Sequence, residues 1–302
     1  MQNRKEKIFE VKSCIYSINC LTLRQKSTVV NIQVSQYALS SLLLVAAAAV
    51  VMPLLEYLLP FDSQLFTYPL NVVLMVLWLF IVWEMYRRRG SSAVARYLLS
   101  RAATVTAIAL LAVGCIVMGL QREPATESYL FMAMTLFVMT QLLMVTLRGW
   151  RSGGGIRWVF TLCHVGLLLV LIAGFWGAPD TEVLRARVTA EPSREFYYED
   201  GSRGVTEYTI SLTEVRVEHY PNGAPLSYEA DIKVDDNDVT LRVNHPYKVR
   251  VGEHIYLTSV DEKQKDMCIV QLVRQPWQRV SLVGILLLIG GAVLILFRGP
   301  RG

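Results

Sequence analysis

Cysteine is scarce in this sequence, and none of the five cysteines belongs to a recognised redox or haem-attachment motif. There is no C-x-x-C pair, so thioredoxin-like exchange has no support, and no C-x-x-C-H, so the chain is not a c-type cytochrome. Cys268 is the one cysteine between residues 178 and 279. An intrachain disulfide in that interval is therefore excluded, and a thiol-reducing function is disfavoured.

Motifs of soluble enzymes are missing as well. The sequence has no Ser/His/Asp or Cys/His arrangement, no Walker loop and no dinucleotide-binding glycine pattern. Residues 235–238 are rich in aspartate but lack the glycine and final glutamate of a calcium loop, so we interpret them as a hairpin turn. His219, His245 and His254 fit no zinc spacing and are interpreted as surface or strand-end residues. Hydrolytic catalysis of the soluble type is therefore not expected.

Long apolar runs, in contrast, recur along the chain. Each has roughly the 17 to 25 residues needed to cross a hydrocarbon core of about 30 Å. The predicted membrane helices cover residues 37–59, 69–86, 102–120, 129–147, 158–177 and 280–297. A charged 36-residue tail precedes the first run, which is therefore not interpreted as a cleaved signal peptide. The sequence thus predicts a polytopic α-helical membrane protein with six helices.

Positive charge is distributed unevenly between the ends of these segments. Short cytoplasmic loops accumulate Lys and Arg. Both termini and the connections 87–101 and 148–157 are basic, whereas the loops 60–68 and 121–128 together contain one basic residue, Arg122. We therefore expect cytoplasmic termini and place residues 178–279 on the outer face of a cytoplasmic membrane.

Net charge differs between the predicted parts. Residues 178–279 hold 13 basic and 18 acidic residues, a balance of −5, whereas the rest of the chain carries +10. The basic residues lie at helix ends and form no stripe with interleaved aromatics. Nucleic-acid binding is therefore not expected.

Residues 178–279 show the period-two alternation of half-buried strands. The predicted strands cover residues 208–217, 228–234, 239–243, 247–251, 255–260 and 268–273. The apolar phase reverses after Leu212, which predicts a β-bulge near Glu214. Six to eight short strands in this interval indicate a small sandwich or half-barrel between helices five and six.

One histidine, His164, lies inside the fifth apolar segment. An imidazole in hydrocarbon is costly unless a partner helix, a cavity or a cofactor satisfies it, so such a residue is a functional-site hypothesis by default. The neighbouring Cys163 points about 100° away on a helix, and we interpret it as core filler rather than as a second ligand. His164 is therefore the candidate functional residue.

Four local motifs accompany this order of elements. They are LCHVGLLLVLIAG at 162–174, LSYEADIKV at 226–234, VNHPY at 243–247 followed by GEHIY at 252–256, and QPW at 275–277. In order and spacing they resemble the ResB/CcsB family, membrane proteins of the system II cytochrome c maturation pathway. The resemblance runs from about residue 102 to residue 297, and residues 1–90 precede it.

The resemblance implies a membrane partner of the CcsA/ResC type, haem b as the cofactor carried outward, and apocytochrome c as its recipient. In the family, a histidine of the helix before the outer domain and one of the partner ligate haem inside the membrane. His164 is at the matching place, so it is the expected axial ligand of the haem iron. The family's tryptophan-rich haem loop belongs to the partner, so this chain is at most one subunit of a cytochrome c synthase, or haem lyase, and no catalytic residue is assigned.

An alternative stays open at this point. The chain is then a membrane-anchored assembly factor that presents apocytochrome or stabilises the partner without ligating haem, and His164 hydrogen-bonds a neighbouring helix. In both cases the expected organisation is the same. It comprises a cytoplasmic tail (1–36), a two-helix extension (37–101), a three-helix ResB-like membrane unit (102–177), an extracytoplasmic β domain (178–279) and a closing helix (280–302).

The arginine asymmetry makes a direct prediction about topology. Reporter fusions after Arg89 and Arg151 should report a cytoplasmic position, and fusions after Thr126 and Asp236 an outer one. An outer signal at Arg151 would overturn the six-helix arrangement.

Overall fold

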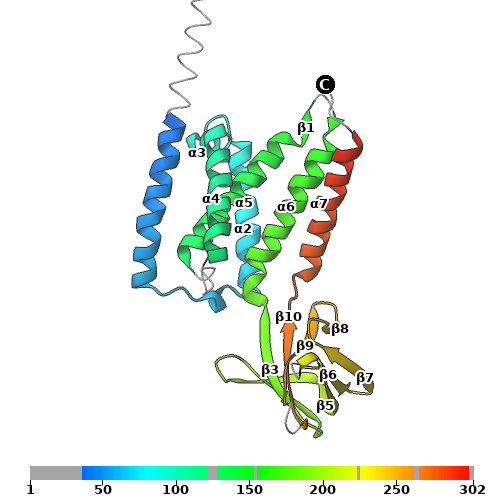
Figure 1. Cartoon of the computed structure of the whole chain (residues 1–302). Coiled ribbons are helices and arrows are strands. Elements are labelled where there is room, and N and C mark those ends of the chain that lie inside the picture. The colour runs from blue at the N-terminus through cyan, green and yellow to red at the C-terminus, as the bar shows by residue number, and fades with distance from the viewer. Residues whose placement is uncertain (1–35, 121–127, 153–154, 223–224, 262–264, 299–302) are drawn as a thin grey trace, which may run out of the picture. The chain divides into compact units, whose positions relative to one another are not determined.

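The computed structural model describes residues 36–120, 128–152, 155–222, 225–261 and 265–298. Within these ranges, six helices are long and apolar enough to cross a membrane. They are Gln36–Leu58, α2 (Leu70–Arg87), α4 (Arg101–Leu120), α5 (Tyr129–Gly149), α6 (Trp158–Trp176) and α7 (Gln278–Arg298) (Figure 1). Every boundary lies within two residues of its prediction. The predicted tail with Cys14 and Cys20 lies outside the described residues.

Short elements join these helices. They are η1 (Ser63–Phe66), α3 (Ala93–Leu98), β1 (Arg151–Ser152), β2 (Gly155–Ile156) and η2 (Ala178–Asp180). Helix α3 begins where Ser92 accepts a hydrogen bond from the backbone N–H of Ala95, which satisfies one of the free donors at a helix start. It buries Ala95 and Leu98.

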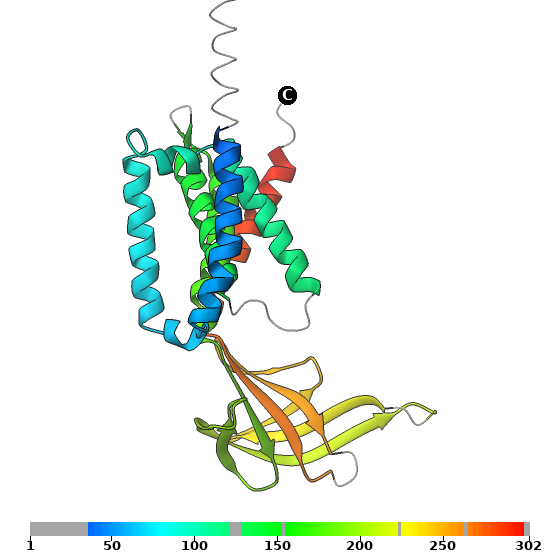
Figure 2. The same ribbon diagram turned by 90° about the vertical axis from the view of Figure 1, so that its left-hand side faces the viewer.

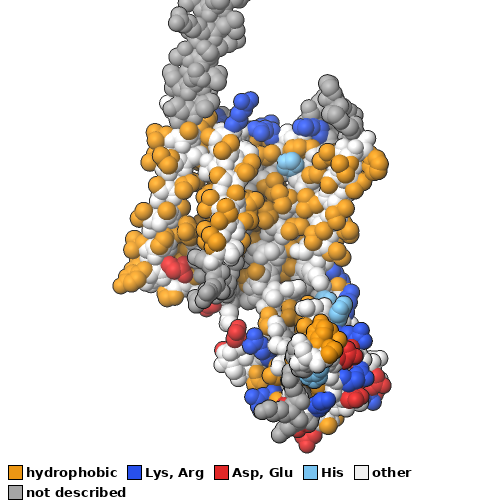
Figure 3. Space-filling view, in the orientation of Figure 1, with side chains coloured by type: hydrophobic (Ala, Val, Ile, Leu, Met, Phe, Trp, Pro, Cys, Tyr) orange, Lys and Arg blue, Asp and Glu red, His pale blue; other side chains and the backbone are white. Residues whose placement is uncertain are grey.

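The surface of the helices is that of a protein solvated by hydrocarbon. In the 18-residue apolar stretch of each of these helices, only between 6% and 28% of the residues are buried. Most of the apolar side chains therefore face outward. Figure 3 shows hydrophobic side chains covering the helical part, whereas acidic side chains gather mainly on the β-rich part. Water would not solvate so large a continuous apolar surface.

The chain forms two compact units, which are described separately. The first comprises Met1–Asp62 and Leu77–Arg151. Its helices are joined by polar contacts inside the apolar segments: Gln141 Nε2 donates to Thr104 Oγ1 at 2.7 Å, and Trp78 Nε1 donates to Thr140 Oγ1 at 2.9 Å. Interhelical hydrogen bonds of this kind contribute about 0.6 to 2 kcal/mol each in a membrane.

The second unit comprises Ser63–Val76 and Ser152–Gly302, and it contains α6, α7 and one antiparallel sheet. The strands are β3 (Glu182–Val188), β4 (Ser193–Tyr197), β5 (Arg203–His219), β6 (Pro225–Val234), β7 (Asn237–Arg242), β8 (Tyr247–Arg250), β9 (Glu253–Val260) and β10 (Cys268–Arg274). Their order across the sheet is β7-β6-β5-β4-β3-β10-β9-β8. In Figure 2 the paired strands β5 and β6, yellow-green to yellow, form its longest ladder.

The eight strands share one hydrophobic core. Strands β6 and β7 also contact β9, although neither is its neighbour in the sheet. Buried side chains from β3 to β7 and from β9 and β10 form a single cluster, which includes Leu184, Phe196, Ile232, Leu241, Ile255 and Leu272. The sheet therefore curls around its own core, which agrees with the predicted half-barrel and not with a sandwich of two separate sheets.

The predicted hairpin and bulge are confirmed, but the turn is shorter than the predicted residues 235–238, because Asn237 and Asp238 are paired with β6 and begin β7. Strands β6 and β7 pair from Glu229↔Arg242 to Val234↔Asn237, so the turn consists of Asp235 and Asp236. Asp235 has a positive φ of 51°, and its Oδ1 accepts a hydrogen bond of 2.8 Å from the N–H of Thr209. The β5–β6 register shifts between Leu212 and Glu214, where the reversal of apolar phase predicted it.

Strands β3 and β4 were not predicted from the sequence. β3 does alternate, with Leu184, Ala186 and Val188 buried and both Arg185 and Arg187 exposed. A small alanine and two arginines make this a weak strand signal. β4 buries only Phe196, so its pattern is weaker still.

Because the sheet buries its own core, a fragment of residues 178–279 should be soluble and give a β-type circular dichroism spectrum. Ile232 is 1% exposed, so Ile232→Asp places an unpaired carboxylate in the core and should unfold the fragment. The matched change Asn237→Ser, in an exposed residue beside the turn, should leave the urea midpoint nearly unchanged. A mainly helical spectrum, or an unaltered midpoint for Ile232→Asp, would refute this core.

Candidate functional site

His164 is the seventh residue of α6 and is half-buried. Its Nδ1 lies 2.8 Å from the carbonyl oxygen of Phe160, one turn earlier. The two rings stack, with centroids 3.8 Å apart and planes inclined by 26°. The guanidinium of Arg157 lies over the Phe160 ring, 4.8 Å from its centroid. The imidazole is therefore held by its own helix.

The hydrogen bond also decides which ring nitrogen carries the proton. A carbonyl oxygen can only accept, so Nδ1 of His164 carries the proton and the Nε2 lone pair is available to a ligand. Among the described residues, no hydrogen bond to Nε2 is found. A histidine that donates one N–H to a backbone carbonyl and offers the other nitrogen is arranged as metal-ligating histidines are.

Close packing against α7 fixes the rotation of α6. A Cβ on Gly166 would lie 2.8 Å from the carbonyl oxygen of Gly284, and a Cβ on Gly284 would lie 2.8 Å from that of Gly166. A Cβ on Gly291 would lie 2.5 Å from Cys163 Sγ. The glycines let the two backbones approach, as small residues do between membrane helices. Cys163 is thus packed against α7, in agreement with its interpretation as core filler.

His164 points away from this contact. At about 100° per residue, its side chain is turned about 130° from the centre of the face formed by Cys163, Gly166 and Val170. Helix α7 therefore does not face the imidazole. The helical spacing therefore favours approach to Nε2 from the side of α6 that is not packed on α7.

The carboxylate of Asp180, just after the end of α6, accepts hydrogen bonds from residues at the starts of α2 and α7. Asp180 Oδ1 accepts from the N–H of Tyr68 at 2.7 Å, and Oδ2 accepts from Asn71 Nδ2 and from Trp277 Nε1, both at 2.7 Å. Asn71, fully buried, also donates to the carbonyl oxygen of Trp176 at 2.8 Å. Charge-assisted hydrogen bonds are about twice as strong as neutral ones, so this cluster fixes α6 relative to the starts of α2 and α7.

This cluster was not predicted from the sequence. Its two signals were Asn71, a lone amide in an apolar segment, and Trp277 of the QPW motif, which was noted without a role. A Cβ on Gly177 would lie 2.3 Å from Trp277 Cγ, so the indole packs directly on the end of α6. Pairing of Asp180 with both residues depends on tertiary structure and has no local pattern.

A second missed carboxylate lies where the sheet meets the helices. Glu253 is only 2% exposed. Its oxygens accept from Arg274 Nε at 2.8 Å, from Tyr208 Oη at 3.1 Å and from Arg250 Nε. Arg274 also pairs with Glu182 at 3.1 Å. These residues tie the first residue of β3 and the last of β10 together, next to α6 and α7 (Figure 1).

The electrostatics of this network suit a fixed ion pair rather than an acid or base. Burial alone would raise the pKa of Glu253, but hydrogen bonds from Arg274, Arg250 and Tyr208 outweigh it and hold that pKa below its ordinary value. Burial and the adjacent carboxylate raise the pKa of Tyr208. Burial also raises the pKa of Cys268 to about 12, so its thiol is not a nucleophile.

The remaining histidines lie apart. His219 ends β5, His245 is in the turn after β7, and both are exposed, whereas His254 is half-buried in β9. In the described part of the chain, no three or more His, Cys, Asp or Glu residues could together hold a metal ion.

Replacement of Glu253 should show its ionic role through pH. Glu253→Gln removes the charge that two arginines share, and should cost the fragment 178–279 about 2 kcal/mol at neutral pH. Because the folded pKa is lowered, this stabilisation is complete above the ordinary glutamate pKa of about 4.3 and is lost as the pH falls through the folded value. Urea unfolding at about pH 7 and about pH 3 should therefore show the gap between variant and wild type shrinking in acid. A gap of the same size at both pH values would contradict the ionic role.

Comparison with known proteins identifies the part of the chain that carries these features. The ResB-like family model matches residues 152–278, fewer than half of the residues. No curated protein matches the chain. Among solved structures, it is similar to the cytochrome c haem lyase CcmF with 15% identity and a TM-score of 0.32, over 63% of this chain and 33% of that one. The chain spans about a third of that protein's length, and a TM-score this low does not indicate a shared overall fold.

The resemblance drawn from the sequence motifs is confirmed over the matched residues. They include the whole of α6 with His164, all eight strands of the sheet and the QPW motif before α7. Residues 152–278 are therefore a ResB-like segment.

Proposed function

We propose that this chain is a membrane subunit of the cytochrome c biogenesis machinery. In this proposal it acts with a CcsA/ResC-type membrane partner in a system II pathway, handles haem inside the membrane and passes it to apocytochrome c. The family match to residues 152–278 and the six apolar helices support this role.

The observation that carries the proposal is the state of His164. Its Nδ1–H is engaged by the Phe160 carbonyl, no hydrogen bond to Nε2 is found among the described residues, and the helical spacing turns His164 away from the residues packed on α7. A neutral imidazole offers haem iron an axial ligand without bringing a charge into hydrocarbon. The second axial ligand then comes from the partner, on the side of α6 that α7 leaves uncovered.

Arg157 is placed to bind a second part of the haem molecule, its carboxylates. It lies two turns from His164, and the Phe160 ring stacks between them. A guanidinium near the end of a membrane helix pairs well with carboxylates such as those of haem. We assign Arg157 to these carboxylates and His164 to the iron.

The position of His164 along α6 suggests where haem is bound. His164 is about 9 Å along the axis from the start of α6, given a rise of 1.5 Å per residue. The basic connection before α6 is cytoplasmic in the predicted topology, so His164 lies in the cytoplasmic half of the membrane. Haem bound there is at the entry of the outward path, and transfer to apocytochrome c takes place beside the sheet on the outer face.

The test is substitution of His164 in the complex of the full chain with its partner. His164→Ala should lower the haem retained by the purified complex and abolish holocytochrome formation, while the complex still assembles. Added imidazole should partly restore both, because coordination is the interaction that was lost. Arg157→Gln should also lower haem retention, but imidazole should not restore it. His254→Ala, an extramembrane histidine, is the matched control and should behave as wild type.

Two results would contradict the proposal in different ways. Normal haem content and cytochrome maturation in His164→Ala would rule out ligation and leave the assembly-factor function. Loss of the complex itself would indicate a packing role, in which Nε2 hydrogen-bonds a helix of the partner; such a bond contributes about 0.6 to 2 kcal/mol.

A further inference from the structure

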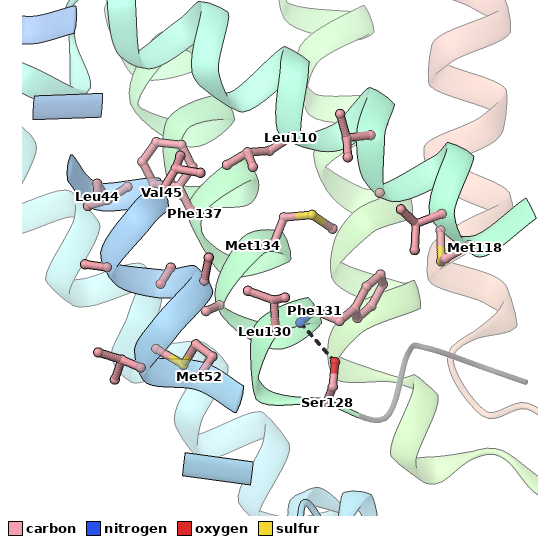
Figure 4. A pocket seen from close by; sticks show the side chains of 18 residues that line it. Leu44, Val45, Met52, Leu110, Met118, Ser128, Leu130, Phe131, Met134 and Phe137 are labelled. Atoms are coloured by element: carbon pink, nitrogen blue, oxygen red, sulfur yellow. Dashed lines mark hydrogen bonds between the residues drawn. The ribbon is translucent and has the colours of Figure 1, made fainter. Parts of the chain in front are cut away.

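A large cavity lies in the first unit, far along the sequence from His164. Its volume is about 1190 Å³, and its walls come from the helix Gln36–Leu58, α4 and α5. Figure 4 shows side chains of the first helix, among them Leu44 and Met52, on one side of this space and Met118 and Phe131 on the other.

Polar contacts at both ends hold the first helix in place. Near its start, the hydroxyls of Ser41 and Tyr97 share a hydrogen bond of 2.8 Å. Near its end, the Glu56 carboxylate accepts from the N–H of Tyr129 at 3.0 Å and from that of Phe61 at 3.2 Å. Between these points the walls carry small residues, among them Ala48 and Gly114. The ends are fixed and the middle stays open, so the cavity does not close by collapse of the helix.

The lining has almost no polar group. Among the residues that the structure describes, every lining residue except Ser128 is apolar, and the Ser128 hydroxyl accepts a hydrogen bond of 3.2 Å from the N–H of Phe131 at the start of α5. No charged side chain or histidine of the described ranges lines the space. Haem, whose carboxylates need cations, and any charged solute are therefore poor occupants, and hydrocarbon is a good one.

The depth of the cavity matches one leaflet of a bilayer. Its walls are residues 44–52, 110–118 and 128–137. At 1.5 Å per residue, each stretch covers about 12 to 14 Å, close to half of a hydrocarbon core of about 30 Å. The cavity extends from the end where α4 stops and α5 starts to about the middle of these helices.

From these observations we infer that the cavity is a binding site for the acyl chains of a membrane phospholipid. The lipid comes from the leaflet at the N-terminal end of α5, and its headgroup stays at the membrane surface. A transmembrane helix of a partner fits less well. Such a helix crosses about 30 Å of hydrocarbon, whereas the walls of the cavity cover only about 12 to 14 Å of that depth.

The site can be tested with a phospholipid that carries a photoreactive diazirine near the middle of one acyl chain. The full chain is reconstituted in phosphatidylglycerol and phosphatidylethanolamine vesicles that contain this probe. After illumination, mass spectrometry should find a several-fold higher yield of adducts on Met52, Met118 and Met134 than on Val50, which is exposed and does not line the cavity.

Filling the cavity should remove the signal. Ala48→Phe projects a ring into the space and should reduce the adducts on the three methionines several-fold, whereas Ala46→Phe, an exposed position outside the lining, should leave them unchanged. Gly114→Leu serves if Ala48→Phe does not fold, since a Cβ at that position meets only the movable end of Met134. Equal labelling of Val50 and the lining, or labelling insensitive to a folded filling variant, would overturn the proposal. Labelling that disappears when the CcsA/ResC-type partner is bound would also overturn it and would make the cavity a docking site for that partner.

Discussion

The hydrogen bond from His164 Nδ1 to the Phe160 carbonyl is the interaction on which the proposed chemistry depends. A polar group in hydrocarbon has no water to bind, so its partners must come from the protein or from a ligand. The bond to Phe160 satisfies one nitrogen within α6 and fixes the tautomer. The other nitrogen then needs an outside partner. In the proposed function haem iron meets this requirement, on the side of α6 that is not packed against α7.

The rest of the second unit holds that face in position. Glycines at the α6–α7 contact set the rotation of α6, and the Asp180 cluster fixes its end. The sheet is joined to the same two helices, because β3 follows α6 and β10 precedes α7. The Glu253 network joins those two strands at their ends nearest the helices. His164 and the sheet thus belong to the same compact unit.

Much of this fold could be predicted from the sequence, for identifiable physical reasons. Length and apolarity identify membrane helices, and the alternation of apolar and polar residues identifies the hairpin and the bulge of the sheet. The positions of these elements were therefore predicted accurately. His164 was singled out as a candidate because one imidazole in an apolar segment is costly, and its role as a ligand stays a prediction. The Asp180 and Glu253 clusters were missed because their members meet only after folding. The rotation of His164 away from α7 was also beyond sequence patterns, because it follows from close glycine packing between segments more than 100 residues apart.

The most direct test is a spectroscopic measurement of whether a histidine nitrogen of this chain coordinates the haem iron. Histidine labelled with ¹⁵N would be introduced into this chain alone, and the ferric haem complex with its unlabelled partner examined by pulsed electron paramagnetic resonance. The account predicts a ¹⁵N coupling to iron from the labelled chain in wild type and its absence in His164→Ala supplied with unlabelled imidazole. Bound haem that shows no coupling to ¹⁵N in the wild-type complex would contradict the assignment of His164 as its ligand.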